Sequence, residues 1–114
     1  MRGDCRDSLS DIVDAVKDIE NSVKGLDFES FVDNKEKVYA ALYCLQIIGE
    51  AVKNIPDEIK EKCSEIPWRQ IAGMRDRLIH GYFTVDLERV WQTIEYDLPP
   101  LKETVKKILR DTIG

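Results

Sequence analysis

The sequence has little of what secreted, metal-binding or membrane proteins need. Its 114 residues include one histidine, three cysteines, 6 glycines and 4 prolines, which excludes a collagen-like or loop-rich chain. The cysteines are odd in number, widely spaced and without a CxxC pair, so we expect neither a metal site nor a disulfide framework. No apolar run approaches the ~20 residues of a membrane span, and the N-terminus lacks a signal-peptide core, so we expect a cytoplasmic protein.

Positive charge is also scarce. The chain has 17 Lys and Arg against 22 Asp and Glu, a net charge of -5 at pH 7. An acidic surface repels phosphates, so a protein that coats nucleic acid is excluded unless a local positive patch exists. With 43% hydrophobic and 34% charged residues, the chain is too apolar to be disordered. Its length suits one compact domain over residues 1–114.

The first half of the chain shows the apolar spacing of amphipathic helices. We expect one helix over about residues 8–24, with Ser8 and Asp11 as a capping box and Gly25 as its stop. A second helix is expected from residues 33–34 to just before Pro56. Its apolar stripe is wide, so it either lies at the centre of a bundle or also faces another subunit. Gly49 inside this helix predicts a close helix crossing.

The second half continues the helical pattern without strand-like alternation. Short helices are expected over about residues 56–64 and 67–81, and a long one over 86–112. Pro99 and Pro100 remove two amide donors, which predicts a kink there. The predicted fold is an all-α bundle of four or five helices, with its last long helix kinked at these prolines.

Residues 69–83 surround the only histidine and carry a local charge of +2, from Arg69, Arg75 and Arg77 against Asp76. On a helix, Asp76 and His80 share a face, so the carboxylate can orient the imidazole. His80 would lie in the last turn, where the helix dipole favours the charged ring. A titratable imidazole beside guanidinium groups suits chemistry on a phosphodiester. The alternative is a histidine that only caps a helix, beside an ordinary ion pair.

The same residues carry a family resemblance. Arg75-Asp76-x-x-x-His80 resembles the Arg-polar-x-x-x-His signature of the HEPN-superfamily ribonucleases, and with Tyr82 it matches the Arg-x4-His-x-Tyr pattern of the HepT toxins. The resemblance extends to residues 48–51, 68–74, 90–91 and 97–99, and so covers most of the chain. It implies a metal-independent ribonuclease without a cofactor, built as a homodimer whose two motifs face a shared cleft, and paired with an MntA-type nucleotidyltransferase antitoxin.

Carried onto this sequence, the resemblance assigns roles to individual residues. His80 is the implied acid/base for attack of a ribose 2′-OH on the adjacent phosphate, Arg75 binds that phosphate, and Asp76 positions the pair. Tyr82 resembles the tyrosine to which the antitoxin transfers AMP. Each added phosphate would then occupy the place of substrate phosphate. Two further residues are expected near the cleft, namely Glu50, which either lines it or packs helices together, and Arg77.

Two other functions remain open at this point. The chain could be a non-catalytic nucleotide- or RNA-binding module on the same fold, for which an acid/base residue is unnecessary. It could also be a helical protein-interaction module whose wide apolar stripe binds a partner. The leading hypothesis is an endoribonuclease toxin, because the complete Arg75, Asp76, His80 and Tyr82 set is present.

Overall fold

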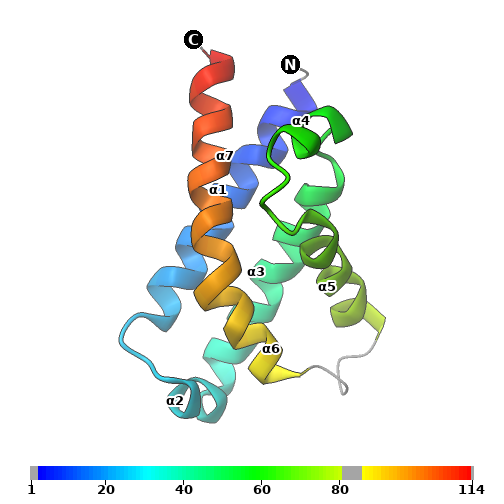
Figure 1. Ribbon diagram of the computed structural model, residues 1–114. Coiled ribbons are helices and arrows are strands. Elements are labelled where there is room, and N and C mark those ends of the chain that lie inside the picture. The colour runs from blue at the N-terminus through cyan, green and yellow to red at the C-terminus, as the bar shows by residue number, and fades with distance from the viewer. Residues whose placement is uncertain (1–2, 81–85, 114) are drawn as a thin grey trace.

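The computed structural model describes residues 3–80 and 86–113, with side chains for residues 5–75 and 86–111. In these ranges all regular structure is helical, which confirms the predicted all-α class (Figure 1). No helix in them combines the length and apolar character needed to cross a membrane. In chain order the elements are α1 (Gly3–Val23), α2 (Phe28–Asp33), α3 (Lys35–Lys53), α4 (Asp57–Lys62), α5 (Trp68–His80), α6 (Leu87–Gln92), the π-helical turn η2 (Thr93–Asp97) and α7 (Leu98–Ile113).

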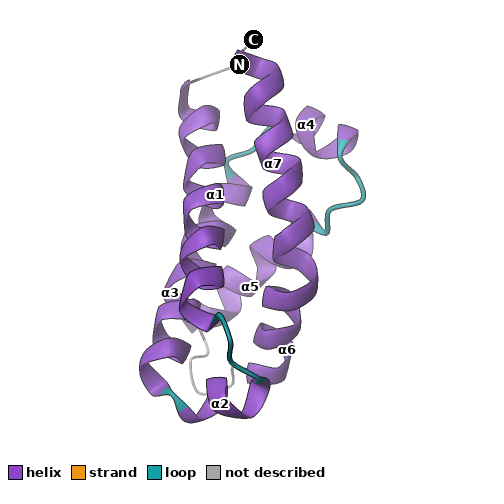
Figure 2. Cartoon of the chain, turned by 90° about the vertical axis from the view of Figure 1, so that its left-hand side faces the viewer, coloured by secondary structure: helices purple, strands orange, loops and turns teal. Residues whose placement is uncertain are grey.

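Helix α3 lies at the centre of the bundle, between α1 and α5, and α7 packs along α1 (Figures 1 and 2). The start of α1 and the end of α7 lie at the same end of the bundle, while α2 closes the other end (Figure 1). The core forms where the apolar faces meet, and apolar burial is the main favourable contribution to folding. Its fully buried large side chains are Phe31, Leu9, Ile12, Ile19, Ile48, Leu98, Leu101, Val16, Val52, Val90 and Val105.

Helix α1 begins earlier than the sequence predicted. It starts at Gly3, so the capping box proposed at Ser8 is wrong, and Ser8 is a buried residue within the helix. The apolar stripe extends back to Cys5, which is only 3% exposed and lies one helical turn before Leu9. The predicted end is confirmed, because α1 stops at Val23 and Gly25 adopts a positive φ of 81°.

Helix α2 was not predicted. The side chain of Asp27 accepts a hydrogen bond from the Ser30 backbone N–H at 2.8 Å and so caps its N-terminus. A six-residue helix has little stability of its own. Here it is held by aromatic packing, with the buried Phe31 ring centroid 5.0 Å from that of Trp91 on α6.

Helix α3 matches the sequence prediction at both ends. Asn34 accepts a hydrogen bond from the Lys37 N–H at 3.2 Å at its start, and the helix ends at Lys53, before Pro56. Of the two explanations for its wide apolar stripe, the central position is the one seen. The stripe is buried against α1 and α5, and only Tyr39 within it is exposed. The width of the stripe therefore gives no argument for a second subunit.

The last helical segment is continuous from α6 through η2 into α7 (Figure 1). The disturbance expected at Pro99 and Pro100 appears one turn earlier, as a π-helical turn in which the Leu98 N–H donates to the Thr93 carbonyl. Prolines have no amide hydrogen, so the turn before them cannot complete the regular α pattern. An ion pair of 2.6 Å between Lys102 and Glu20 joins α7 to α1.

Candidate active site at the crossing of α3 and α5

The close helix crossing predicted at Gly49 is confirmed. A Cβ atom placed on Gly49 would overlap with Cβ of Arg75 and would stand 3.3 Å from the backbone oxygen of Ile71. A glycine inside a helix costs ~1 kcal/mol relative to alanine. The cost is explained here by packing, because only a residue without a side chain lets α3 approach α5 this closely.

This crossing brings Arg75 beside Glu50. The Nε atom of Arg75 lies 3.1 Å from a carboxylate oxygen of Glu50, the residue that directly follows Gly49. The side chains are 29% and 55% exposed, respectively. An ion pair this exposed contributes at most about 1 kcal/mol to stability. Its main effect is to hold the guanidinium group in one orientation at the surface.

A polar hollow of about 330 Å³ opens around this ion pair. The hollow lies between α1, α3 and α5. Tyr43 lines it, and 67% of the surface of this residue is exposed. An oriented guanidinium group binds phosphate, and an exposed aromatic ring can stack on an unpaired base. The hollow therefore offers both kinds of contact that a single-stranded nucleotide needs. The polar residues lining it are Ser8, Asp11, Tyr43, Gln46, Glu50, Asn54 and Arg75.

The remaining predicted site residues follow Arg75 on the same helix. Helix α5 continues to His80, as the sequence predicted, and therefore carries Arg75, Asp76, Arg77 and His80 on one helix. The side chains of Asp76, Arg77 and His80 lie outside the described residues, as does Tyr82. The structure thus brings Arg75 and Glu50 together, while the predicted pairing of Asp76 with His80 stays a prediction.

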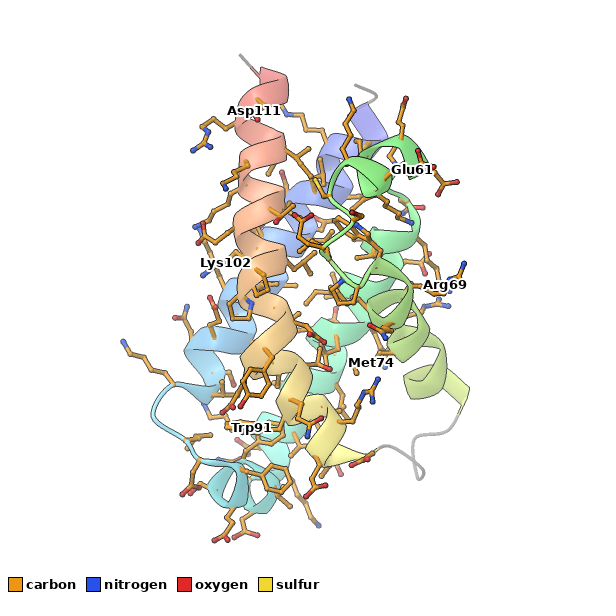
Figure 3. The ribbon with its side chains drawn as sticks, in the orientation of Figure 1. Glu61, Arg69, Met74, Trp91, Lys102 and Asp111 are labelled. Carbon is orange, nitrogen blue, oxygen red and sulfur yellow. The ribbon has the colours of Figure 1, made fainter. Side chains whose placement is uncertain are left out.

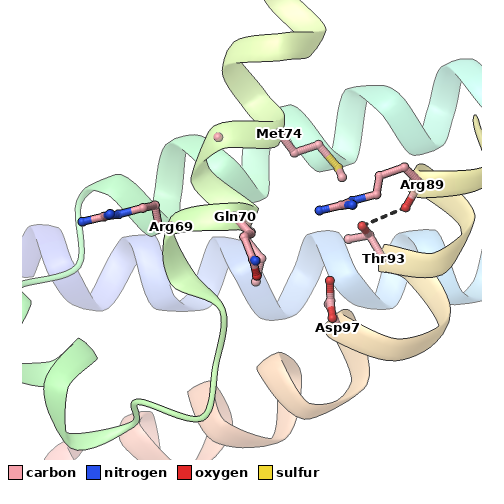
Figure 4. Close-up of a pocket in the computed structure, with 8 residues that line it drawn as sticks. Arg69, Gln70, Met74, Arg89, Thr93 and Asp97 are labelled. Carbon is pink, nitrogen blue, oxygen red and sulfur yellow. Dashed lines mark hydrogen bonds between the residues drawn. The ribbon is translucent and has the colours of Figure 1, made fainter. Parts of the chain in front are cut away.

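A second polar pocket, which the sequence analysis missed, lies between α5 and the α6–η2 segment (Figure 4). Its volume is about 270 Å³, and its lining includes Gln70 and Met74 from α5 with Arg89, Thr93 and Asp97. Met74 lies on the side of α5 that faces α6, whereas Arg69 extends outward (Figure 3). Burial raises the pKa of the Asp97 carboxyl group, and the positive charge of Arg89 offsets part of that rise.

A signal for this pocket was present in the sequence. Asp97 falls seven residues after Val90 and three after Ile94, on the apolar face of the last helix. A carboxylate at a position where the pattern calls for a core side chain indicates a polar site inside the bundle. The sequence could not show its partners, because Gln70 comes from a different helix.

The three cysteines are free thiols, and none shows the features of a nucleophile. Burial raises the pKa of each thiol, so the reactive thiolate form is disfavoured. This agrees with the prediction that Cys44 is a packing residue, since it is half-buried beside the core. Within the described part of the chain, no cluster of three or more His, Cys, Asp or Glu side chains could hold a metal ion.

Comparison with known proteins identifies the family. The model of the family described as "Ribonuclease HepT-like" matches residues 12–108, which include the α3–α5 crossing and the whole of α5. The chain belongs to the HepT-like ribonuclease family. This confirms the resemblance drawn from Arg75, His80 and Tyr82.

Curated relatives of this HepT-like chain match it almost end to end. A protein of Thermococcus cleftensis named "Probable ribonuclease HepT" is 44% identical over 108 residues, or 95% of this chain and 98% of the relative. A protein of Methanocaldococcus jannaschii, named as a candidate RNase, is 46% identical over 111 residues, covering 97% and 92% of the two chains. No solved structure matches the chain significantly.

Proposed function

We propose that this HepT-like protein is a metal-independent endoribonuclease that cleaves RNA at the α3–α5 crossing. The observation that carries the proposal is the position and orientation of the Arg75 side chain. Its guanidinium group is oriented by Glu50 at the edge of a polar hollow, on the same helix that carries His80. The family match supports the same substrate class. The local charge of +2 over residues 69–83 favours the approach of a polyanion to α5.

The proposed reaction is an internal transfer at one phosphodiester. The imidazole of His80 accepts the proton of a ribose 2′-OH, whose oxygen attacks the adjacent phosphorus while the bond to the 5′-oxygen of the next nucleotide breaks. The leaving oxygen takes a proton, so the products are a 2′,3′-cyclic phosphate and a 5′-OH. Arg75 binds the phosphate and stabilises the charge that develops on its oxygens. Asp76, four residues before His80, is a positioning residue for the imidazole.

The test is RNA cleavage in the presence of EDTA, with the fragment ends identified by mass spectrometry. We expect 2′,3′-cyclic phosphate ends from the wild-type protein. His80→Ala removes the proton acceptor and should lower the rate about 10²- to 10⁴-fold. Arg75→Ala should also abolish most of the cleavage. Arg110→Ala is the matched control, because Arg110 is an exposed arginine on α7, paired only loosely with Asp111 at 3.9 Å.

Undiminished cleavage by His80→Ala would overturn the proposal. If the wild-type protein binds RNA through Arg75 and cleaves none at any pH, the chain is a binding module instead. Circular dichroism spectra must be unchanged in all variants for either conclusion to hold.

We further propose that the active form is a homodimer in which the two motifs share one cleft. Tyr43 supports this, because it is largely exposed and lies on the same face of α3 as Glu50. Two-fold pairing is the commonest arrangement of homo-oligomers, and it would double the local positive charge. Light scattering should show a dimer that Tyr43→Lys weakens. Tyr96→Lys is the control, since Tyr96 is equally exposed but lies on η2. A wild-type monomer at assay concentration would contradict the proposal.

The regulatory partner we propose is an MntA-type nucleotidyltransferase antitoxin that attaches AMP to Tyr82. The added phosphates would compete with substrate phosphate for the same cationic site. Incubation with such an enzyme and ATP should add AMP to the wild-type chain and block cleavage. Tyr82→Phe should stay unmodified and active. Equal modification of both proteins would place the target on another residue.

A further inference from the structure

The pocket between α5 and the α6–η2 segment contains a glycine that packing among the described residues does not explain. Gly73 lies inside α5, and a Cβ atom placed on it would meet no described atom within 4 Å. Gly49 is the opposite case, because a Cβ there would overlap with Arg75. A helix interior disfavours glycine relative to alanine. An empty site in front of Gly73 is therefore consistent with close approach of a ligand to the helix backbone.

Three hydrogen-bonding side chains are directed into this pocket. Figure 4 shows the Arg89 guanidinium, the Gln70 amide and the Asp97 carboxylate around one space. In the part of the chain that the structure describes, Arg89 and Asp97 do not approach within ion-pair distance of each other. Opposite charges that face a shared cavity without pairing leave a donor group and an acceptor group for a third molecule.

The rest of the pocket combines a buried hydroxyl group with an apolar wall. Thr93 is 3% exposed, and its hydroxyl donates to the Arg89 carbonyl at 3.0 Å, which fixes the turn that carries Arg89. Ile71 and Met74, both buried, supply an apolar wall on the α5 side. A flat ring with polar edges fits such a site, because its faces contact apolar atoms while its edges meet fixed donors and acceptors.

The two charged side chains of the pocket, Arg89 and Asp97, together match the edges of one base. Guanine presents two acceptors, O6 and N7, which match the paired N–H groups of an arginine. It also presents two parallel donors, N1–H and N2–H, which match the two oxygens of an ionised carboxylate. Cytosine and adenine offer a carboxylate one amino group only. Uracil flanks its single N–H with carbonyl oxygens, which a carboxylate repels.

We propose that this pocket binds a guanine base, with Asp97 accepting from its N1–H and N2–H and Arg89 donating to its O6 and N7. The base belongs either to an RNA strand or to a free guanine nucleotide. The pocket is separate from the proposed cleavage site. Arg75 lines the hollow at the α3–α5 crossing and not this pocket, and Gly73, two residues before it, is turned about 160° away from it around the helix axis. Only the choice of RNA as the source rests on the proposed function.

The first test is calorimetric titration of the full-length protein with GMP, AMP, CMP, UMP and XMP. GMP should bind wild type at least about tenfold more tightly than the other four. Asp97→Asn should reverse this preference in favour of XMP, because an amide accepts from N1–H while it donates to the additional oxygen of xanthine. Asp111→Asn, which changes an exposed carboxylate on α7, is the matched control and should behave as wild type. GMP affinity equal to that of AMP in wild type, or unchanged by Asp97→Asn, would overturn the proposal.

The second test fills the pocket without changing its charge. Gly73→Leu places a side chain in the open space, so it should lower GMP affinity at least about tenfold while the circular dichroism spectrum stays the same. Arg89→Gln should lower it comparably, and Arg110→Gln serves as its control. Wild-type affinity for GMP in Gly73→Leu would show that the base does not occupy this pocket, even if GMP binds elsewhere.

Two further experiments identify the source of the base and test the guanine site independently of the ribonuclease proposal. The protein is titrated with an RNA oligomer that contains a single G and with the same oligomer carrying A at that position. If the G oligomer binds more tightly, and Asp97→Asn abolishes the difference, the base in the pocket comes from RNA. Binding of GMP without that difference identifies a free nucleotide. Arg75→Ala should retain GMP binding although cleavage is lost. If the wild-type protein cleaves no RNA, the ribonuclease proposal fails while GMP titration still decides the guanine site.

Discussion

On each of two sides of α5 lie a glycine, an arginine and an acidic residue, and the two sets are arranged in opposite ways. On the side facing α3, atoms of α5 occupy the space where a side chain of Gly49 would lie, and Arg75 pairs directly with Glu50 at 3.1 Å. On the side facing α6, Gly73 faces open space, and Arg89 and Asp97 stand around a cavity of about 270 Å³. A glycine inside a helix of this protein therefore has one of two distinct causes. One is close packing of the protein with itself, and the other is space kept open.

The largest difference between the two sides should appear when each glycine is given a methyl group. Gly49→Ala should lower the free energy of unfolding by about 1–3 kcal/mol, because the helices must separate to admit the methyl group. Side-chain rotation cannot relieve the overlap, since the atoms in the way are Cβ of Arg75 and the backbone oxygen of Ile71. Urea unfolding measures the change. Stability equal to wild type would mean that α3 and α5 do not cross this closely.

The same substitution on the other side should act in the opposite direction. Gly73→Ala should raise the free energy of unfolding by about 0.5–1 kcal/mol, because alanine is the better helix former and its methyl group meets no described atom. Urea unfolding beside Gly49→Ala gives a matched pair. A loss of stability in both variants would remove the distinction between a packed and an open glycine.

The smallest effect should be a pH-dependent one at Asp97. Burial raises the pKa of this carboxyl group above its ordinary value of 3.8, despite the opposing charge of Arg89, so ionisation weakens the folded state. Asp97→Asn removes that cost and should be slightly more stable than wild type at neutral pH. Its advantage should shrink as the pH falls through the folded-state pKa of Asp97 and vanish below 3.8. Unfolding curves across this range measure it, and an advantage that grows on acidification would contradict the assignment.

The long helices could be predicted from the sequence because their apolar spacing reports directly on the buried face. The ends of α3 followed from Asn34 and Pro56, and the crossing followed from Gly49, since each acts through local backbone chemistry. Helix α2 escaped prediction because its stability comes from packing on Trp91, which is distant in sequence. The start of α1 was missed because Cys5, which is buried, lies among charged residues and was not recognised as part of the apolar stripe.

The residues of the candidate site also differ in whether the sequence alone could predict them. Arg75 and Glu50 could be proposed from a motif and a family position, and the fold brings them together. The guanine pocket could not, because Gln70 and Asp97 are on different elements and no short spacing links them. Only tertiary packing places them around one space. The misplaced carboxylate at Asp97 was the one trace of the pocket in the sequence.

The most direct test of the account is the rate at which two variants cleave a guanine-free RNA strand in EDTA. Arg75→Gln changes the proposed phosphate-binding side of α5, and Asp97→Asn changes the proposed base-binding side. We predict that Arg75→Gln loses nearly all cleavage, while Asp97→Asn cleaves this strand at the wild-type rate. Equal losses in the two variants would contradict the assignment of separate roles to the two sides of α5.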